Sequence, residues 1–303
     1  MSLRAPGDRL AAASEMPSDR GLVAFTSAAP TRSAGWLGRV PLVAAALFLA
    51  ALAVAAAWPA VLAPFDPYAV DTANALAAPG GAHPLGTDEN GRDILSRLIY
   101  GARASLLLGF GAIAIAVAGG VLFGLAAGLG NRFLDGLIMR TMDVGLAFPE
   151  LLLALVVISI VGGGTTNALL AIGLASIPSY ARLVRAQTFA IRQAPYIEAA
   201  RALGVRESQV VWRHVLPNAV KPVVILATIG IGTATVAGSA LSFLGLGTAP
   251  PEPEWGSMLS SARNFLDLAW WYGAFPGLAI TGLVISTTLI GRYLQQRSEG
   301  RGA

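Results

Sequence analysis

The sequence predicts an all-α membrane protein in which six helices cross the bilayer. Hydrophobic residues make up 55% of the 303 positions and charged residues only 13%, which is about half the charged share of a typical soluble domain. The apolar residues gather in long runs separated by polar segments. A run of about 20 apolar residues can cross a bilayer as a helix, so we expect one helical, multi-pass domain.

The first part of the chain contains a tail and then an apolar run. Residues 1–39 are rich in Ala, Ser, Gly, Pro and Arg without a sustained period, so we expect a flexible tail. Residues 40–63 are almost wholly apolar and form the first predicted span. A signal peptide would have a shorter apolar core nearer to residue 1, so we interpret this run as an uncleaved helix.

A polar segment, residues 64–102, follows the first span. Gly86 and Gly91 favour turns there, and we expect Asp88 to cap a short helix that starts nearby. An enzyme-like loop of Asp and Arg is conceivable. We instead expect the segment to position the next helix.

Five further spans are predicted in residues 103–294. They are residues 105–130, 143–161, 167–181, 220–246 and 268–294. Gly120, Gly124 and Gly128 recur every four residues and share one helix face, which allows another helix to approach closely. We expect residues 131–142 to be a short polar connection and residues 295–303 to be a second tail.

The largest basic loop lies between the fourth and fifth spans. Its cations are Arg182, Arg185, Arg192, Arg201, Arg206, Arg213 and Lys221. Six spans place this loop on the same side as both termini, together with 17 of the 21 Lys and Arg residues. Cytoplasmic segments carry an excess of these residues. We therefore expect this loop and both termini to be cytoplasmic, and residues 64–102 to be extracytoplasmic.

Two short helices joined at a glycine are expected within this loop. Ala199 and Ala200 are good helix formers, and Gly204 can adopt a backbone conformation that ends a helix. Residues 207–215 are expected to form a second short helix that ends or bends at Pro217. Together they would make a compact knob whose small side chains fit a groove in another protein.

The spacing in this loop resembles the EAA loop of permease subunits of ATP-binding-cassette (ABC) importers. The matching residues are Glu198, Ala199, Ala200, Gly204, Leu216 and Pro217. His214 stands where the family usually has an apolar residue. The resemblance implies a type I ABC importer permease architecture, with residues 198–217 as the coupling element that docks into a cleft of the ATPase subunit.

Other segments resemble one branch of this family, the C-type permease of dipeptide, oligopeptide and nickel importers. They are residues 83–103, residues 241–247 and the Pro-rich run 250–259. The end of the chain departs from the branch, because Gly291-Arg292 stands where an Asn-Leu-Leu-Gly-Asp stretch is common. The substrate stays open between a dipeptide, a longer peptide, a nickel chelate and another solute.

The same resemblance implies a location and partners. The chain would be a multi-pass subunit of the bacterial cytoplasmic (inner) membrane, in contact with the lipid bilayer. It would pair with a B-type permease, with two ABC ATPase subunits that bind ATP and Mg²⁺, and with an extracytoplasmic substrate-binding protein. The net charge of +4 is explained by topology and predicts no nucleic-acid partner.

No catalytic residue, metal site or cofactor is predicted in this chain. A phosphate-binding loop needs Gly-x-x-x-x-Gly-Lys-Ser/Thr, and Lys221, the only lysine, has no such loop before it. His83 and His214 are expected on opposite sides of the membrane, and Cys is absent, so they cannot form a metal centre together. We therefore expect ATP hydrolysis in partner subunits and not in this chain.

One acidic residue, Glu150, is expected within the third span. An acid inside the membrane is costly and is a functional candidate by default, which makes Glu150 a candidate for substrate binding. The plainer alternative is that Pro149 kinks the helix and Glu150 faces a wet gap or pairs with an Arg. The alternative function is a proton-coupled secondary transporter, which would use such acids as relays. It is less favoured because the chain shows a single deep acid, no matched second half and a loop shaped for an ATPase.

Overall fold

A computed structural model describes residues 40–298 and residue 300. These residues form helices and connecting loops, and their only strand-like pairing is an isolated bridge between Thr87 and Asp93. The predicted tail 1–39 lies outside the described residues, as do residue 299 and residues 301–303 of the predicted second tail.

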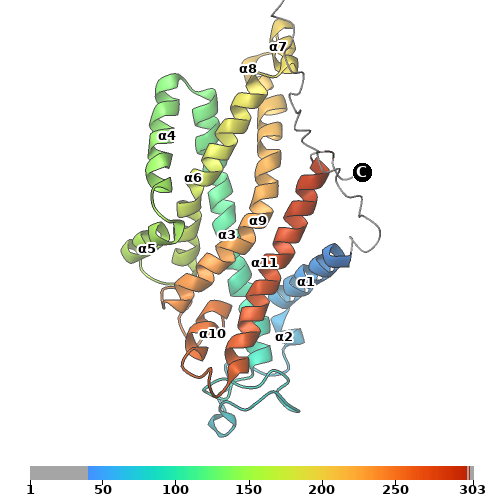
Figure 1. The fold of residues 1–303 in the computed structure, drawn as a ribbon, viewed down its shortest axis with the longest axis vertical. Helices are drawn as coiled ribbons and strands as arrows, with labels where there is room; N and C mark the ends of the chain where they lie inside the picture. Colours follow the sequence, from blue (N-terminus) through green and yellow to red (C-terminus); the bar gives the residue numbers. More distant parts are fainter. Residues whose placement is uncertain (1–39, 299, 301–303) are drawn as a thin grey trace, which may run out of the picture.

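Five long helices form the body of the molecule, and the first of them lies obliquely to its long axis (Figure 1). They are α1 (Val40–Ala57), α3 (Ile94–Leu129), α6 (Thr165–Arg192), α9 (Leu216–Phe243) and α11 (Trp270–Ser298). Each is long and apolar enough to cross a membrane, α9 together with the helical turns before it. A bent helix pair, described next, brings the number to six if the pair is counted as one span. The predicted all-α, multi-span fold is confirmed.

The third predicted span is bent. It consists of α4 (Arg132–Leu146) and α5 (Glu150–Val161), whose axes differ in direction by 94°. Pro149 immediately precedes α5, and a proline has no backbone N–H to continue the helix before it. The kink at Pro149 that the plainer alternative for Glu150 expected is present, and the predicted span over residues 143–161 is interrupted between α4 and α5.

The predicted polar connection over residues 131–142 is wrong, because these residues form most of α4. The Asn131 side chain accepts a hydrogen bond from the Leu134 N–H at 2.9 Å and caps the helix, as Asn does well at an N-cap. Two ion pairs, Arg185 with Asp135 and Arg182 with Asp143, attach α4 to α6. The charged residues thus anchor a helix rather than forming a loop.

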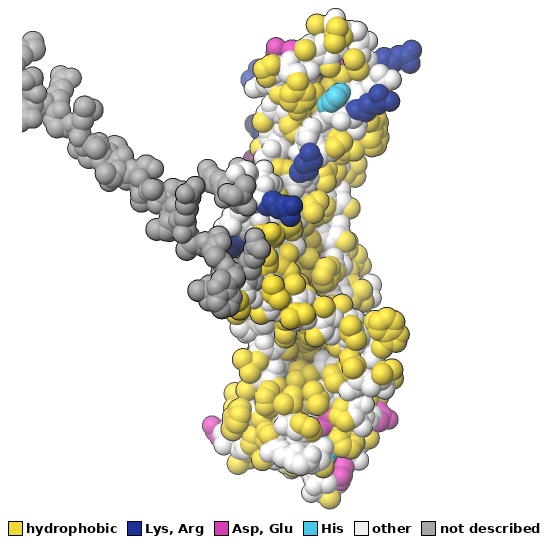
Figure 2. All heavy atoms as spheres, turned by 90° about the vertical axis from the view of Figure 1, so that its right-hand side faces the viewer, with side chains coloured by type: hydrophobic (Ala, Val, Ile, Leu, Met, Phe, Trp, Pro, Cys, Tyr) yellow, Lys and Arg dark blue, Asp and Glu magenta, His cyan; other side chains and the backbone are white. Residues whose placement is uncertain are grey.

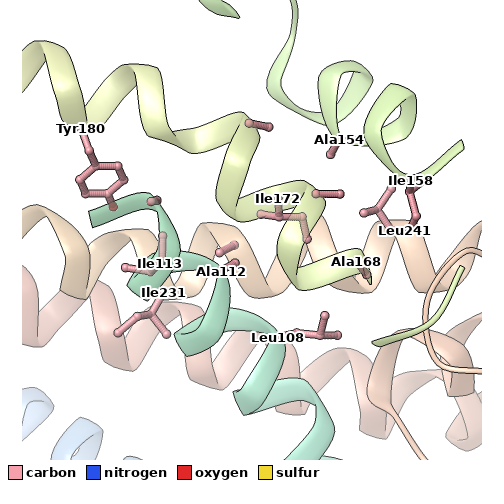
Figure 3. Packing of buried hydrophobic residues seen from close by; sticks show 14 of the residues in the cluster. Leu108, Ala112, Ile113, Ala154, Ile158, Ala168, Ile172, Tyr180, Ile231 and Leu241 are labelled. Atoms are coloured by element: carbon pink, nitrogen blue, oxygen red, sulfur yellow. The ribbon is translucent and has the colours of Figure 1, made fainter. Parts of the chain in front are cut away.

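The main core lies where α3, α5, α6 and α9 meet (Figure 3). Leu108 and Ala112 of α3, Ala168 and Ile172 of α6, and Leu241 of α9 are all buried there. The predicted glycine stripe contributes to the same packing. A Cβ on Gly128 would lie 2.7 Å from the Thr188 Cβ of α6, closer than real Cβ atoms approach. The predicted close helix contact is confirmed.

The segment before α3 folds against the α10 (Trp255–Ala262) end of the molecule. Gly86 and Gly91 have φ of +77° and +74°, which confirms the predicted turns. The predicted cap is wrong, because Asp93 and not Asp88 caps α3: its Oδ2 accepts from the Ser96 N–H at 2.7 Å. Asp88 is fully buried and pairs with Arg92 at 2.7 Å.

Helix boundaries differ from the predicted spans at several ends. The first span breaks after Ala57 and resumes as the short helix α2 (Pro59–Leu62), because a residue before proline disfavours the helical backbone. Helix α3 starts at Ile94, within the predicted extracytoplasmic segment, and α11 continues to Ser298.

Charged side chains are unevenly distributed along the molecule. On the face in Figure 2, Lys and Arg gather over the half that ends at α7 (Pro195–Ala202), most Asp and Glu lie at the opposite end, and the middle is mostly hydrophobic. Such a middle band suits a lipid environment.

Candidate functional site

The Arg-rich loop forms a knob at the end of the molecule farthest from α10 (Figure 1). We define the knob as residues 195–217. Its first arm is α7, which begins at Pro195, a favourable first helical residue because that position needs no N–H partner. Glu198 lies in the first turn of α7, where a carboxylate interacts favourably with the helix dipole.

The corner of the knob is Gly204, which has φ of +79°. Its N–H donates to the Arg201 carbonyl at 2.9 Å, and the Val205 N–H donates to the Ala200 carbonyl at 3.1 Å. This pair of bonds is a Schellman motif, in which glycine accommodates the left-handed backbone. The prediction that Gly204 ends the helix is confirmed. A Cβ there would meet no atom within 4 Å. The positive φ, and not a lack of space, is therefore the reason that glycine is favoured at this position.

The second arm is not a separate short helix, so the prediction for residues 207–215 is wrong. Helix α8 (Glu207–Val210) passes through a π-helical turn (Val211–Val215) directly into α9. The Leu216 N–H donates to the carbonyl of Val211, five residues back. Pro217 cannot donate in this way, and the wide turn before it lets the helix continue instead of ending.

A small hydrophobic core holds the two arms together. Ile197 of α7, together with Val210 and Val215 of the second arm, is fully buried, and Leu129 at the end of α3 packs against them. The Arg192 guanidinium donates to the Gly128 carbonyl at 2.6 Å. The knob is therefore folded in its own right and attached to the ends of α3 and α6.

An ion pair spans the corner. Arg201 Nε lies 2.6 Å from Glu207 Oε1, and the two side chains are 33% and 65% exposed. The hydrogen bond to Glu207 raises the pKa of Arg201 above its ordinary value. Because both groups are open to solvent, the pair orients the arms more than it stabilises the fold.

Large apolar side chains are exposed on the knob. Leu203 is 85% exposed, Trp212 is 69% exposed and Tyr196 is 48% exposed. Sequence reasoning did not single out these three residues, although a Leu and a Trp within an Arg-rich loop are a usable signal. Large exposed apolar side chains are a common feature of surfaces that bind another protein or a membrane.

The structure separates the six residues of the EAA-like pattern into two groups. Glu198 and Ala199 are exposed on α7, Ala200 is half-buried beside them, and Gly204 follows at the corner. Leu216 and Pro217 lie on the second arm, where they line a groove of about 720 Å³ between α9 and α11. The His214 ring contacts the Tyr196 ring edge-on, with centroids 6.3 Å apart, and so links the arms.

Glu150 lies at the start of α5, beside the bend, and is exposed. Its carboxylate accepts a hydrogen bond from the Ser176 hydroxyl of α6. Of the plainer alternative, the kink at Pro149 is confirmed. The pairing with an Arg is not found, because Arg182 and Arg185 pair with Asp143 and Asp135.

The histidines lie in separate regions. His83 Nδ1 is 2.9 Å from Asp93 Oδ1 in the segment before α3, whereas His214 is in the knob. Within residues 40–298 there is no group of three His, Cys, Asp or Glu side chains that could hold a metal ion.

Two solved structures of ABC transporters share this fold. The MetNI methionine ABC transporter in an inward-facing conformation matches with a TM-score of 0.53 over 66% of this chain and 95% of that chain, at 20% identity. An amino acid ABC transporter with bound histidines matches with a TM-score of 0.51 over 68% and 94% of the two chains, at 19% identity. These matches support the fold.

Curated relatives are more similar in sequence. The dipeptide transport system permease protein DppC of Alkalihalophilus pseudofirmus is 43% identical over 73% of both chains. The di/tripeptide transport system permease protein DppC of Pseudomonas aeruginosa is 44% identical over 70% of both chains. The glutathione transport system permease protein GsiD of Pectobacterium atrosepticum is 41% identical over 84% of both chains.

A family match covers most of the helical region. Residues 120–300 match the family described as the binding-protein-dependent transport system inner membrane component. Together with the relatives, this match supports an ABC permease and gives no support to the proton-coupled alternative. The chain belongs to the binding-protein-dependent transport system inner membrane component family, and it is a multi-pass permease subunit of an ABC importer.

Proposed function

We propose that this chain is the C-type permease subunit of an importer for short peptides, with dipeptides and tripeptides as the main substrates. The support is that two relatives at 43% and 44% identity are described as dipeptide and di/tripeptide permeases. A third, at 41% identity, is described as a glutathione permease, and glutathione is also a short peptide. A nickel chelate is the less favoured substrate.

We propose that the knob couples this subunit to an ATPase. The observation that carries the proposal is its exposed apolar surface, Leu203 and Trp212, on an otherwise Arg-rich end. Burying such side chains against a partner provides most of the binding energy of a typical interface. Glu198, Ala199, Ala200 and Gly204 would form the docked arm, and Leu216 and Pro217 would connect it to α9.

The proposed assembly contains a B-type permease, two ATPase subunits that bind ATP and Mg²⁺, and an extracytoplasmic substrate-binding protein. We propose that the knob and both termini face the cytoplasm, since 17 of 21 Lys and Arg residues would then lie on that side. This chain hydrolyses nothing itself. Closure of the ATPase pair on ATP would move the knob and shift the helices between inward-open and outward-open arrangements.

The test is uptake of labelled dialanine by proteoliposomes that contain the whole complex and its binding protein. Uptake should require ATP in the compartment that the ATPase subunits face. It should continue when a protonophore removes the proton gradient. A complex without this subunit should not transport. Uptake that follows the proton gradient, or that is absent for every short peptide tested, would contradict the proposed function.

A further inference from the structure

A cavity of about 500 Å³ opens near the α10 end of the molecule, within the usual volume range of small-molecule sites, about 300–1,000 Å³. Four stretches of the chain line it: α2 with the loop after it, the first turns of α3, the start of α6, and the Pro-rich loop before α10. Its polar lining residues are Tyr68, Tyr100, Arg103, Thr165, Thr248 and Glu252.

The cavity carries one cation and one carboxylate that are available to a ligand. Arg103 is exposed and makes no hydrogen bond or ion pair with any part of the chain that the structure describes. Glu252 is also exposed and uses one oxygen, Oε2, to accept from the Tyr68 hydroxyl at 2.7 Å. The second oxygen of Glu252 remains available. A guanidinium binds a carboxylate through two parallel hydrogen bonds, and a carboxylate binds an ammonium group.

The walls of the cavity are fixed by buried groups. The Arg97 side chain is buried, and its Nη1 donates to the Pro67 carbonyl at 3.0 Å and to the Pro251 carbonyl at 3.3 Å. These two carbonyls directly precede Tyr68 and Glu252 in the chain. The hydroxyls of Thr165 and Thr248 are 2.7 Å apart and join the other two stretches. The charged groups therefore lie on a rigid frame, as a binding site requires.

The tyrosines favour a cationic group beside Glu252. Partial burial and the hydrogen bond to Glu252 raise the pKa of Tyr68 to about 12, so its hydroxyl stays protonated and keeps orienting the carboxylate at physiological pH. The rings of Tyr68 and Tyr100 line the same cavity, and aromatic faces attract ammonium groups.

We propose that this cavity binds the short peptide during its transfer across the membrane, with Arg103 holding the terminal carboxylate and Glu252 holding the terminal ammonium group. The inference rests on the proposed import of short peptides and adds the site at which this subunit contacts them. A peptide with two free ends carries both charges.

The experiment uses the full complex in proteoliposomes with saturating binding protein, and it measures both dialanine uptake and ATP hydrolysis. Arg103→Gln and Glu252→Gln should each lower the peptide delivered per ATP hydrolysed by about five- to tenfold, while the binding protein still stimulates hydrolysis. Arg103→Lys should restore most of the delivery because it keeps the charge. Arg263→Gln and Asp267→Asn, exposed charges outside the cavity, are the matched controls.

The outcomes separate the site from the function. A wild-type complex that takes up no short peptide contradicts the proposed function. A wild-type complex that transports, with Arg103→Gln and Glu252→Gln equal to their controls, overturns the site and leaves the function intact. An equal loss of uptake and stimulated hydrolysis, without rescue by Arg103→Lys, indicates a structural role and also overturns the site. If Arg103→Gln does not assemble, the peptide delivered per ATP hydrolysed by Glu252→Gln and Arg103→Lys decides whether the site is kept.

Discussion

Gly124 of α3 lies directly against Val184 of α6, so that a Cβ added to Gly124 would be 2.5 Å from the Val184 Cβ. The same register repeats one turn away on each side, where Gly120 faces Tyr180 and Gly128 faces Thr188. Three consecutive contacts at intervals of four residues hold the two helices at a separation that only glycine permits.

A larger residue at Gly124 should therefore disrupt assembly. Gly124→Leu is expected to destabilise the packing of α3 on α6 by about 1–3 kcal/mol or more, as overpacking in close-packed interiors does. The measurement is the yield and thermal stability of the purified complex. Gly136→Leu is the control, because a Cβ on Gly136 meets no atom within 4 Å. Equal yield from both variants would show that this contact is not required.

The corner of the knob depends on backbone conformation. Gly204→Val should place a branched side chain at φ of +79°, which costs about 1–2 kcal/mol or more for a residue with a Cβ. We expect loss of substrate-stimulated ATP hydrolysis while the membrane helices remain folded. Gly204→Asn should retain much of the activity because Asn tolerates this conformation. Normal transport by Gly204→Val would exclude residues 198–217 as the transmitting element.

The exposed apolar residues of the knob should matter for binding and not for folding. Leu203→Ala and Trp212→Ala are each expected to weaken capture of the ATPase subunit by about tenfold, the loss expected for an important interface residue. The unfolding temperature should stay the same, since exposed side chains contribute little to stability. Leu268→Ala, 74% exposed near the other end, is the control. Unchanged ATPase capture by both knob variants would argue against docking through this surface.

Two further positions in the knob should respond differently from each other. Glu198→Ala removes a carboxylate from the first turn of α7. We expect a moderate loss of coupling to the ATPase, either because the carboxylate no longer interacts with the helix dipole or because a contact with the ATPase is lost. His214→Leu should be tolerated, because it restores the apolar residue usual in the EAA-like pattern. The rate of stimulated ATP hydrolysis checks both, and a severe defect in His214→Leu would show that the imidazole has a role of its own.

The proposed orientation can be measured directly because the chain contains no cysteine. In intact cells, Asp267→Cys should react with a membrane-impermeant maleimide, whereas Ser208→Cys in the knob should react only after the membrane is opened. Both positions are exposed, so access to the reagent depends on the side of the membrane. A tag at either terminus should likewise be detected only after the membrane is opened. A C-terminal tag that is accessible in intact cells would contradict the proposed orientation.

Much of the helical fold could be predicted because it depends on local properties. Apolar run length predicted the long helices, the four-residue spacing of glycines predicted a close contact of α3 with another helix, and Gly204 predicted the corner of the knob. Each of these signals lies within a few turns of one helix. None of them requires knowledge of a distant partner residue.

The errors occurred where distant residues decide between local alternatives. Asp88 and Asp93 are both reasonable caps, and the choice falls on Asp93 because Arg92 and the buried Arg97 engage Asp88. The kink at Pro149 was expected, but the helical course of residues 132–142 was not, and two ion pairs with residues of α6 hold that helix in place. The wide turn before Pro217 and the exposure of Leu203 emerge only once the knob is folded.

The uninterrupted helical path through the second arm has a mechanical consequence. Residues Glu207–Phe243 form one helix of 37 residues, which at 1.5 Å per residue is about 55 Å long. Its far end, Phe243, lies a few residues before Thr248, which lines the cavity of about 500 Å³ near α10. Its middle is held in the core, so a sideways push on the knob would be carried along this helix toward the other end of the molecule. Work done by an ATPase on one side could then open or close a peptide's path on the other without either end unfolding.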